Sequence, residues 1–269
     1  MKSVGFFASC PVDLFRPSVG FASVELLEQA GFTVHVPPQS CCGQVNFNNG
    51  VSSQARQLAW NLITTFEPFD YTVIPSGSCG GMIKHHYPEL FQDDPRLPRV
   101  LTFCEKVFEL TDFLVTVAEQ DLTQRLVFPN AQSSATRSSA NPLSEKSAVI
   151  TYHDSCAGLR EMGIKQQPRK LLKACGVAVS EMVDTEVCCG FGGTFCVKHA
   201  QVSARMADNK IDNALAVNAD LVIGGDLSCL LNLAGRAKRR GANLNFRHVA
   251  EVLVGDWQTP AIGEADEQG

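Results

Sequence analysis

The chain has 269 residues, enough for one large domain or two of ordinary size. Its residues are 45% hydrophobic and 19% charged, which excludes a disordered chain, and its net charge of −5 gives no electrostatic basis for binding nucleic acid. No stretch approaches the roughly 20 apolar residues of a membrane span, so no membrane span is expected. The apolar run at the N-terminus is too short for a signal peptide and ends at Pro11, and we therefore expect a cytoplasmic protein.

Strands and helices alternate along the first half of the chain. Short apolar runs predict strands at residues 4–7, 32–36 and 71–74, and a strand-like run at 100–103. Apolar spacing and Pro17 predict helices from 17 to 31, from a cap at Ser52 or Ser53 to Phe66, from 81 to 87 and near 107–117.

The second half is predicted to repeat this order. Strands are expected at residues 148–152, 177–180, 220–223 and 243–246, and helices near 168–174, at 201–216 and up to Arg240. The predicted domains are a first repeat, a Ser/Ala-rich linker, a second repeat and a polar tail that is expected to fray, at residues 1–128, 129–147, 148–254 and 255–269. Alternating strands and helices with short loops predict an α/β fold with two tandem, internally repeated Rossmann-like units, mainly parallel sheets and pseudo-two-fold symmetry.

The cysteines carry the clearest sign of duplication. Cys10 precedes Cys156 by 146 residues, and Cys79 precedes Cys229 by 150. Between them, Cys-Cys-Gly occurs at residues 41–43 and again at 188–190, an offset of 147. Eight of the eleven cysteines thus form a first set and a second set: Cys10, Cys41, Cys42, Cys79; and Cys156, Cys188, Cys189, Cys229.

Each cysteine of the two sets follows a predicted strand. Because sites in open α/β sheets form at the carboxyl ends of the strands, the fold is expected to gather each set in one place. Four thiolates select zinc or an iron–sulfur cluster. Adjacent cysteines, without a Cys-x2-4-Cys knuckle, favour a cluster, since they point in different directions. The glycines Gly190, Gly192 and Gly193 suit a close backbone approach to such a cluster, although a tight turn would also use them.

Other reactive residues have no clear partner in the repeat. Cys104 and Cys175 are expected in the core, and Cys196 is either core or a spare ligand. His153 and Asp154 are expected to hydrogen-bond the loop of Cys156, with proton transfer to a substrate as the alternative.

These motifs resemble the cysteine-rich CCG domain family, which includes the CCG-domain component of heterodisulfide reductase and the iron–sulfur component of glycolate oxidase. Within it, a two-repeat chain without a ferredoxin domain looks most like the LutA/YkgE lactate-utilisation group. The motifs that carry this likeness lie at residues 75–80, 152–156 and 188–195, and the resemblance covers nearly the whole chain outside the linker and tail.

The resemblance implies an iron–sulfur electron-transfer subunit of an L-lactate oxidation complex. Such a subunit is an oxidoreductase component rather than a self-sufficient enzyme, has LutB-like and LutC-like partners and passes electrons toward the respiratory chain. It also implies one or two iron–sulfur clusters of the 4Fe-4S type, with each cysteine set ligating one. Heterodisulfide reductases carry a fifth cysteine per repeat, where Met82 and Asn232 stand here, and this favours a cubane and electron transfer over disulfide chemistry.

Two alternatives stay open. One is a structural or regulatory zinc-binding protein, and the other is a thiol-disulfide reductase of the heterodisulfide reductase type. No Gly-x-Gly-x-x-Gly fingerprint of a dinucleotide site occurs.

Overall fold

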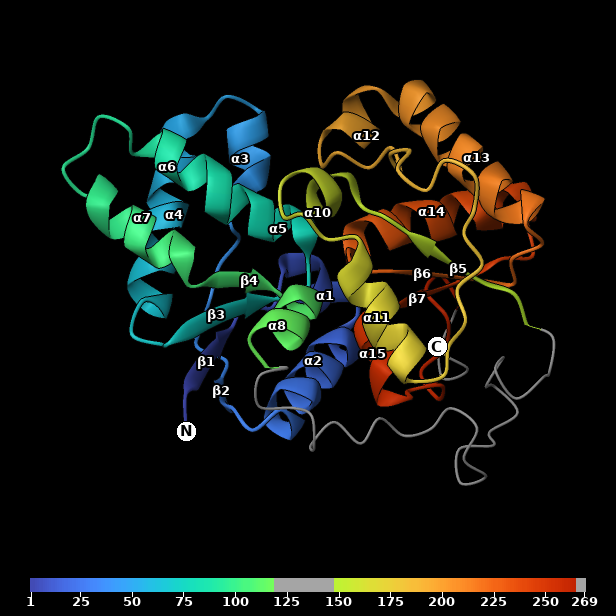
Figure 1. The fold of residues 1–269 in the computed structure, drawn as a ribbon. Helices are drawn as coiled ribbons and strands as arrows, with labels where there is room; N and C mark the ends of the chain where they lie inside the picture. Colours follow the sequence, from blue (N-terminus) through green and yellow to red (C-terminus); the bar gives the residue numbers. More distant parts are fainter. Residues whose placement is uncertain (119–147, 265–269) are drawn as a thin grey trace. The chain divides into compact units, whose positions relative to one another are not determined.

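The structure, a computed structural model, describes residues 1–118 and 148–264 (Figure 1). The predicted linker lies outside the described residues. Two compact units form: the first holds the described residues before the gap together with Ala157–Ile164, and the second holds the remaining residues after it. Among the described residues, no helix is both long and apolar enough to cross a membrane.

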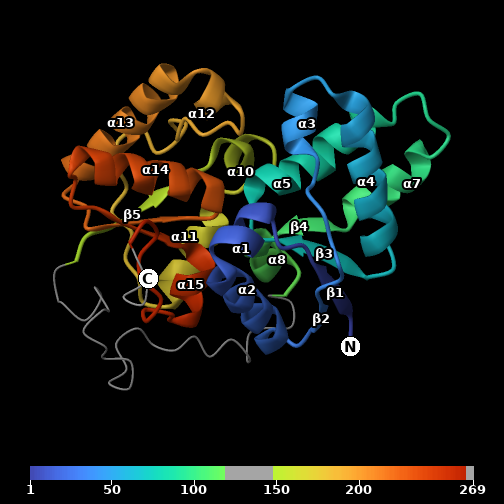
Figure 2. The same cartoon turned by 180° about the vertical axis from the view of Figure 1, so that it is seen from behind.

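The first unit is built on a four-stranded parallel sheet of order β2-β1-β3-β4. Its strands are β1 (Ser3–Phe6), β2 (Thr33–His35), β3 (Tyr71–Ile74) and β4 (Val107–Glu109). Its helices are α1 (Cys10–Phe15), α2 (Pro17–Gln29), α3 (Gln44–Asn48), α4 (Ser52–Phe66), α5 (Gly77–Gly81), the π-helical turn η1 (Met82–His86), α6 (Tyr87–Leu90), α7 (Leu97–Glu105) and α8 (Leu110–Thr116). Figures 1 and 2 show α2 and α8 on one face of the sheet and α4 and α5 on the other.

The second unit is built on a three-stranded parallel sheet of order β5-β6-β7. Its strands are β5 (Ile150–His153), β6 (Leu221–Gly224) and β7 (Asn245–His248). The helices of this half of the chain are α10 (Cys156–Arg160), α11 (Gln166–Ala174), α12 (Phe195–Lys198), α13 (Ala200–Ala216), α14 (Leu227–Arg240) and α15 (Val249–Val254). In Figures 1 and 2, α13 and α14 cover one face of this sheet and α11 and α15 the other. The α/β class with parallel sheets is confirmed.

Strand register confirms the internal repeat at the level of the backbone. Val4 of β1 pairs with Tyr71 of β3, and Ile150 of β5 pairs with Leu221 of β6. These pairs are offset by 146 and 150 residues, the same offsets that relate Cys10 to Cys156 and Cys79 to Cys229.

The core faces of α4 and α13 coincide in the same way. Each helix buries one stripe, and the two stripes match at a constant offset of 148: Ala55, Ala59, Leu62, Ile63, Phe66; and Ser203, Ala207, Lys210, Ile211, Ala214. Because one face of a helix repeats every 3.6 residues, both stripes face the core. A lysine, Lys210, therefore occupies in the second unit the place of Leu62 in the first.

Two predicted strands are wrong. Residues 100–103 lie in helix α7, whose buried side chains Val100, Phe103 and Cys104 follow helical spacing while Leu101 is 46% exposed. A short apolar run fits a strand or a helix equally well until its packing is known. The strand of this region is β4, so the helix predicted near 107–117 begins only at Leu110.

The strand predicted at 177–180 is also absent from the described sheet. Its place beside β5 is marked by one bond only, from the N–H of Ser180 to the carbonyl of Ile150 at 2.7 Å. A single bond does not make the ladder that β2 makes with β1 in the first unit.

The C-terminal segment was expected to fray, but its described part, up to residue 264, packs. Trp257, Ala261 and Ile262 are buried, and the N–H of Ile262 donates to the carbonyl of Phe246 in β7 at 2.9 Å. The side chain of Arg247 adds a hydrogen bond to the carbonyl of Thr259. Apolar residues spaced along a polar segment provide this anchor.

Glu109 is a buried carboxyl that caps helix α8. Its side chain accepts hydrogen bonds from the N–H groups of Thr111 and Asp112 at 2.8 and 3.1 Å. Burial nevertheless raises the pKa of Glu109 to about 7. The folded protein therefore holds this proton more tightly than the unfolded chain, so stability is greatest below the unfolded pKa and falls as pH rises toward 7.

We expect Glu109→Gln to flatten this pH dependence, because the amide still caps the helix but does not titrate. The wild-type free energy of unfolding should fall by roughly 3 kcal/mol between pH 4 and pH 8, given about 1.4 kcal/mol per pKa unit, and the variant should lose most of that slope. Denaturant unfolding at several pH values measures both curves. Parallel curves for the two proteins would contradict the assignment.

Candidate metal centres

The first cysteine set gathers at the carboxyl ends of three strands. Cys10 begins α1 after β1, the pair Cys41-Cys42 lies in the loop after β2, and Cys79 lies in α5 after β3. The sulfurs of Cys42 and Cys79 are 3.5 Å apart. Cys41 contacts both Cys10 and Cys42 through its side chain. The four predicted thiols are thus brought together, although the chain separates them by up to 69 residues.

The second set forms in the same way. Cys156 begins α10 after β5, Cys188 and Cys189 lie in a loop, and Cys229 lies in α14 after β6. The sulfurs of Cys188 and Cys156 are 4.0 Å apart. Cys189 contacts both Cys188 and Cys229, so this set is also continuous.

Equivalent glycines shape both Cys-Cys-Gly loops. Gly43 and Gly190 have φ angles of 85° and 82°, and the N–H of each lies 3.4 Å from the sulfur two residues earlier, in Cys41 and Cys188. A methyl group at Gly190 would approach the carbonyl oxygen of Ser203 in α13 to 2.5 Å. The same group at Gly43 would lie 3.3 Å from a carbonyl of α4. Glycine at Gly43 and Gly190 therefore allows both the positive φ of the turn and the close approach of the neighbouring helix.

The shared geometry also favours one thiolate in each set. The pKa values of Cys41 and Cys188 are held well below the ordinary thiol value. The cause is hydrogen bonding from the neighbouring thiols, first from Cys10 and Cys156, with the glycine N–H groups adding to it. Metal ligation requires deprotonated cysteine, and the thiols of Cys42 and Cys189, whose pKa values are raised, would lose their protons to a bound metal.

We expect Gly190→Ala to destabilise the protein more than Gly43→Ala. Both substitutions put a side chain at positive φ, which costs about 1–2 kcal/mol, but only Gly190 also meets a backbone oxygen at 2.5 Å. Thermal unfolding of the two variants measures the difference. Gly235→Ala is the control, because Gly235 lies inside α14 with open space around it, and it should be neutral or slightly stabilising. Equal effects at the two loop glycines would contradict this interpretation of the clash.

The positions of the missing fifth cysteines have other uses. Asn232 donates from its amide to the carbonyl of Cys189 at 2.9 Å. In the first unit the hydroxyl of Tyr87 makes the matching bond to the carbonyl of Cys42, also at 2.9 Å, while Met82 is fully buried. Asn232 and Tyr87 thus hold the backbone of the cysteine pairs, and neither they nor Met82 adds a thiolate. Sequence spacing alone did not reveal this role of Tyr87.

His153 distinguishes the second site from the first. Its side chain is completely buried, and neither ring nitrogen has a hydrogen-bond partner among the described residues. The expectation that it bonds the loop of Cys156 is therefore wrong. Burial lowers its pKa to about 3, so the imidazole is neutral. Leaving a buried polar group unpaired costs about 1–3 kcal/mol, which calls for a compensating role.

Charged side chains surround the second site as well. Asp154 forms a two-bond ion pair with Arg169, at 2.8 and 2.9 Å, in which the aspartate side chain is 1% exposed. Lys210 is buried, donates to the carbonyls of Asp184 and Thr185, and interacts electrostatically with the thiols of this set. Burial lowers the pKa of Lys210 to about 8.

The three remaining cysteines lie apart from these contacts. Cys104 is buried and donates to the carbonyl of Ile83 at 3.1 Å, and Cys175 is also buried, which confirms the expected core placement. Cys196 donates to the carbonyl of Gly193 at 3.1 Å. Its thiol is thereby tied to its own loop.

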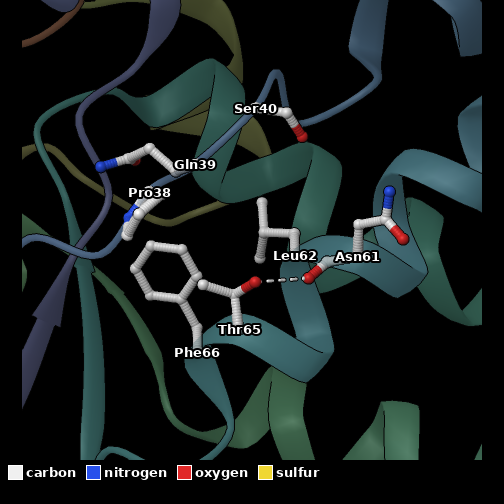
Figure 3. A pocket seen from close by; sticks show the side chains of 7 residues that line it. All are labelled: Pro38, Gln39, Ser40, Asn61, Leu62, Thr65 and Phe66. Atoms are coloured by element: carbon white, nitrogen blue, oxygen red, sulfur yellow. Dashed lines mark hydrogen bonds between the residues drawn. The ribbon is translucent and has the colours of Figure 1, made fainter.

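A surface hollow of about 160 Å³ lies beside the loop that leads to Cys41 (Figure 3). It is lined by Pro38, Gln39, Ser40, Asn61, Leu62, Thr65 and Phe66. Every one of these side chains is uncharged. The hollow itself therefore offers no arginine or lysine to pair with a carboxylate.

The two centres, each built from a cysteine, a Cys-Cys-Gly loop and a further cysteine, define a protein with two cysteine-rich domains. The chain matches the cysteine-rich domain family CCG over residues 4–84 and 150–234. The chain is 41% identical to Lactate utilization protein A of Geobacillus sp. (strain WCH70) over 254 residues, covering 93% of this chain and 98% of the relative. It is 39% identical to Lactate utilization protein A 2 of Bacillus cereus (strain 03BB102), covering 93% and 97%. The chain belongs to the lactate utilization protein A family of CCG-domain proteins.

Proposed function

We propose that this protein is an iron–sulfur electron-transfer subunit of an L-lactate oxidation complex. The observation that carries the proposal is the gathering of two separate four-thiol sets, each at the strand ends of its own parallel sheet. The relatives named for lactate utilization supply the metabolic context.

The residues present suit a cluster. Each set offers four thiols, and glycine N–H groups point at the sulfurs of Cys41 and Cys188. A bound 4Fe-4S cluster would accept one electron and pass it on. The protein's part is to hold the cluster through the eight cysteines, to shield its inner side with buried Cys42, Cys79, Cys189 and Cys229, and to fix the loops through Tyr87 and Asn232.

Electron transfer fits the site better than disulfide chemistry. Neither set has a fifth thiol, because Met82 and Asn232 occupy those positions. We therefore regard this chain as an oxidoreductase component with LutB-like and LutC-like partner proteins. A reducing compartment such as the cytoplasm would keep its thiols free for metal.

A zinc protein is the second candidate, and one observation favours it. Two thiolates on one tetrahedral zinc ion lie about 3.8 Å apart, given a Zn–S distance near 2.3 Å. The sulfur distances of 3.5 Å and 4.0 Å in the two sets are close to that value.

Metal analysis of protein purified without oxygen separates the two candidates. We expect a brown protein with about four to eight irons, matching sulfide and an electron paramagnetic resonance signal after reduction. A colourless protein that holds zinc alone, even after treatment with iron and sulfide, would overturn the electron-transfer function.

A further inference from the structure

The inner side of the second site contains a histidine as well as thiols. One ring nitrogen of His153 and the sulfurs of Cys189 and Cys229 all lie within 4.8 Å of one another, and all three residues are buried. His153 is fully enclosed, and both of its ring nitrogens lack a hydrogen-bond partner among the described residues. A neutral imidazole with a free lone pair beside two thiols is a ready metal ligand.

The first site has no such group among the described residues. By the strand register Phe7 occupies the place of His153. By the matching core faces of α4 and α13, Leu62 occupies the place of Lys210. Phe7 and Leu62 are buried apolar side chains. The two sites thus share their cysteine geometry and differ in the polar groups that line them.

A packing role does not account for His153. Phenylalanine fills the equivalent position in the first unit and brings no buried polar atoms. An imidazole without hydrogen bonds is an unfavourable core residue unless its nitrogen binds something. The groups that face it are the thiols of Cys189 and Cys229 and, by electrostatic interaction, Lys210 and Cys188.

We propose that His153 is a nitrogen ligand of the metal centre held by the second cysteine set, beside Cys189 and Cys229. The inference deepens the proposed function and rests on it. The second centre would then have mixed nitrogen and sulfur ligation, whereas the first is ligated by sulfur alone.

A difference in reduction potential follows. A neutral imidazole ligand brings no negative charge to a cluster, unlike a thiolate, and histidine ligation raises the potential of iron–sulfur centres. Lys210 adds a nearby cation among the same thiols. Both effects stabilise the reduced state, so the second centre should have the higher potential of the two.

Isotope labelling tests the ligand directly. The full chain, grown with ¹⁵N-histidine, is loaded with iron and sulfide without oxygen, reduced, and examined by pulsed electron paramagnetic resonance. We expect the strong ¹⁵N coupling of a metal-bound nitrogen in the wild type and its loss in His153→Phe, the residue of the first unit. His35→Phe is the matched control, because His35 is exposed and stacks on Phe69, and it should keep the coupling.

A second variant covers the case in which His153→Phe fails to load. His153→Cys supplies a thiolate at the same place. We therefore expect wild-type iron content, no ¹⁵N coupling and a lower reduction potential at the second centre than in the wild type. A wild type with full iron but only the weak coupling of a hydrogen-bonded nitrogen overturns the inference alone, as does coupling that persists in His153→Phe. A protein that takes up no iron overturns the proposed function as well.

Discussion

Cys42→Ser is expected to remove about half of the bound iron, and Cys189→Ser the other half. Among the residues that the structure describes, the thiols that each contacts belong to its own set, and each set is built on a separate sheet. Losing a buried ligand should therefore empty one centre and leave the other filled. Iron and sulfide contents with electron paramagnetic resonance of both variants measure this result.

Cys104→Ser is the matched control for these two variants. Cys104 is a buried thiol bonded to a backbone carbonyl and outside both sets, so its replacement should leave the iron content unchanged. Complete loss of iron in both Cys42→Ser and Cys189→Ser would contradict two independent centres and indicate one shared by the two halves of the chain.

Arg169→Ala is expected to destabilise the protein by about 3–5 kcal/mol, because it leaves the buried carboxylate of Asp154 without its counter-charge. The guanidinium also bonds Glu181 and lies 5.1 Å from the ring of Tyr152 in β5. Removing it therefore loosens the strand that leads to Cys156. Denaturant unfolding of the metal-free protein measures the loss without interference from the cluster.

Arg236→Ala supplies the comparison. Arg236 pairs with Asp208 through two hydrogen bonds of similar length, but its side chain is 31% exposed and that of Asp208 is 19% exposed. Water compensates such a pair, so its loss should cost no more than about 1 kcal/mol. Equal losses for the two arginines would show that burial of Asp154 does not carry the effect.

Local patterns were enough to predict most of the elements. The strand at 71–74 is confirmed residue for residue as β3, and the helix predicted to run to Phe66 begins at Ser52 as α4, although Val51 rather than a serine is its N-cap. Both elements have a continuous apolar run or a complete helical stripe, and their neighbours along the chain are enough to specify them.

Packing decided the elements that the patterns left ambiguous. Residues 100–103 fit a strand equally well, and only their contacts in the core of the first unit make them part of helix α7. The segment at 177–180 has strand-like residues but gains one sheet hydrogen bond. Trp257 and Ile262 anchor a segment of polar composition because β7 offers them a place to pack.

The α/β class, the duplication and the two four-cysteine sets can be predicted from the sequence alone. Each of these follows from spacing along one chain, and the strand ends bring spaced residues together by topology alone. The side chains that line each set came to light only with the fold: Tyr87 and Asn232 bond to carbonyls, and His153, which lacks a hydrogen-bond partner in the described part of the chain, stands where the first unit has Phe7. These depend on where a side chain points after long-range packing, and no local pattern records that direction.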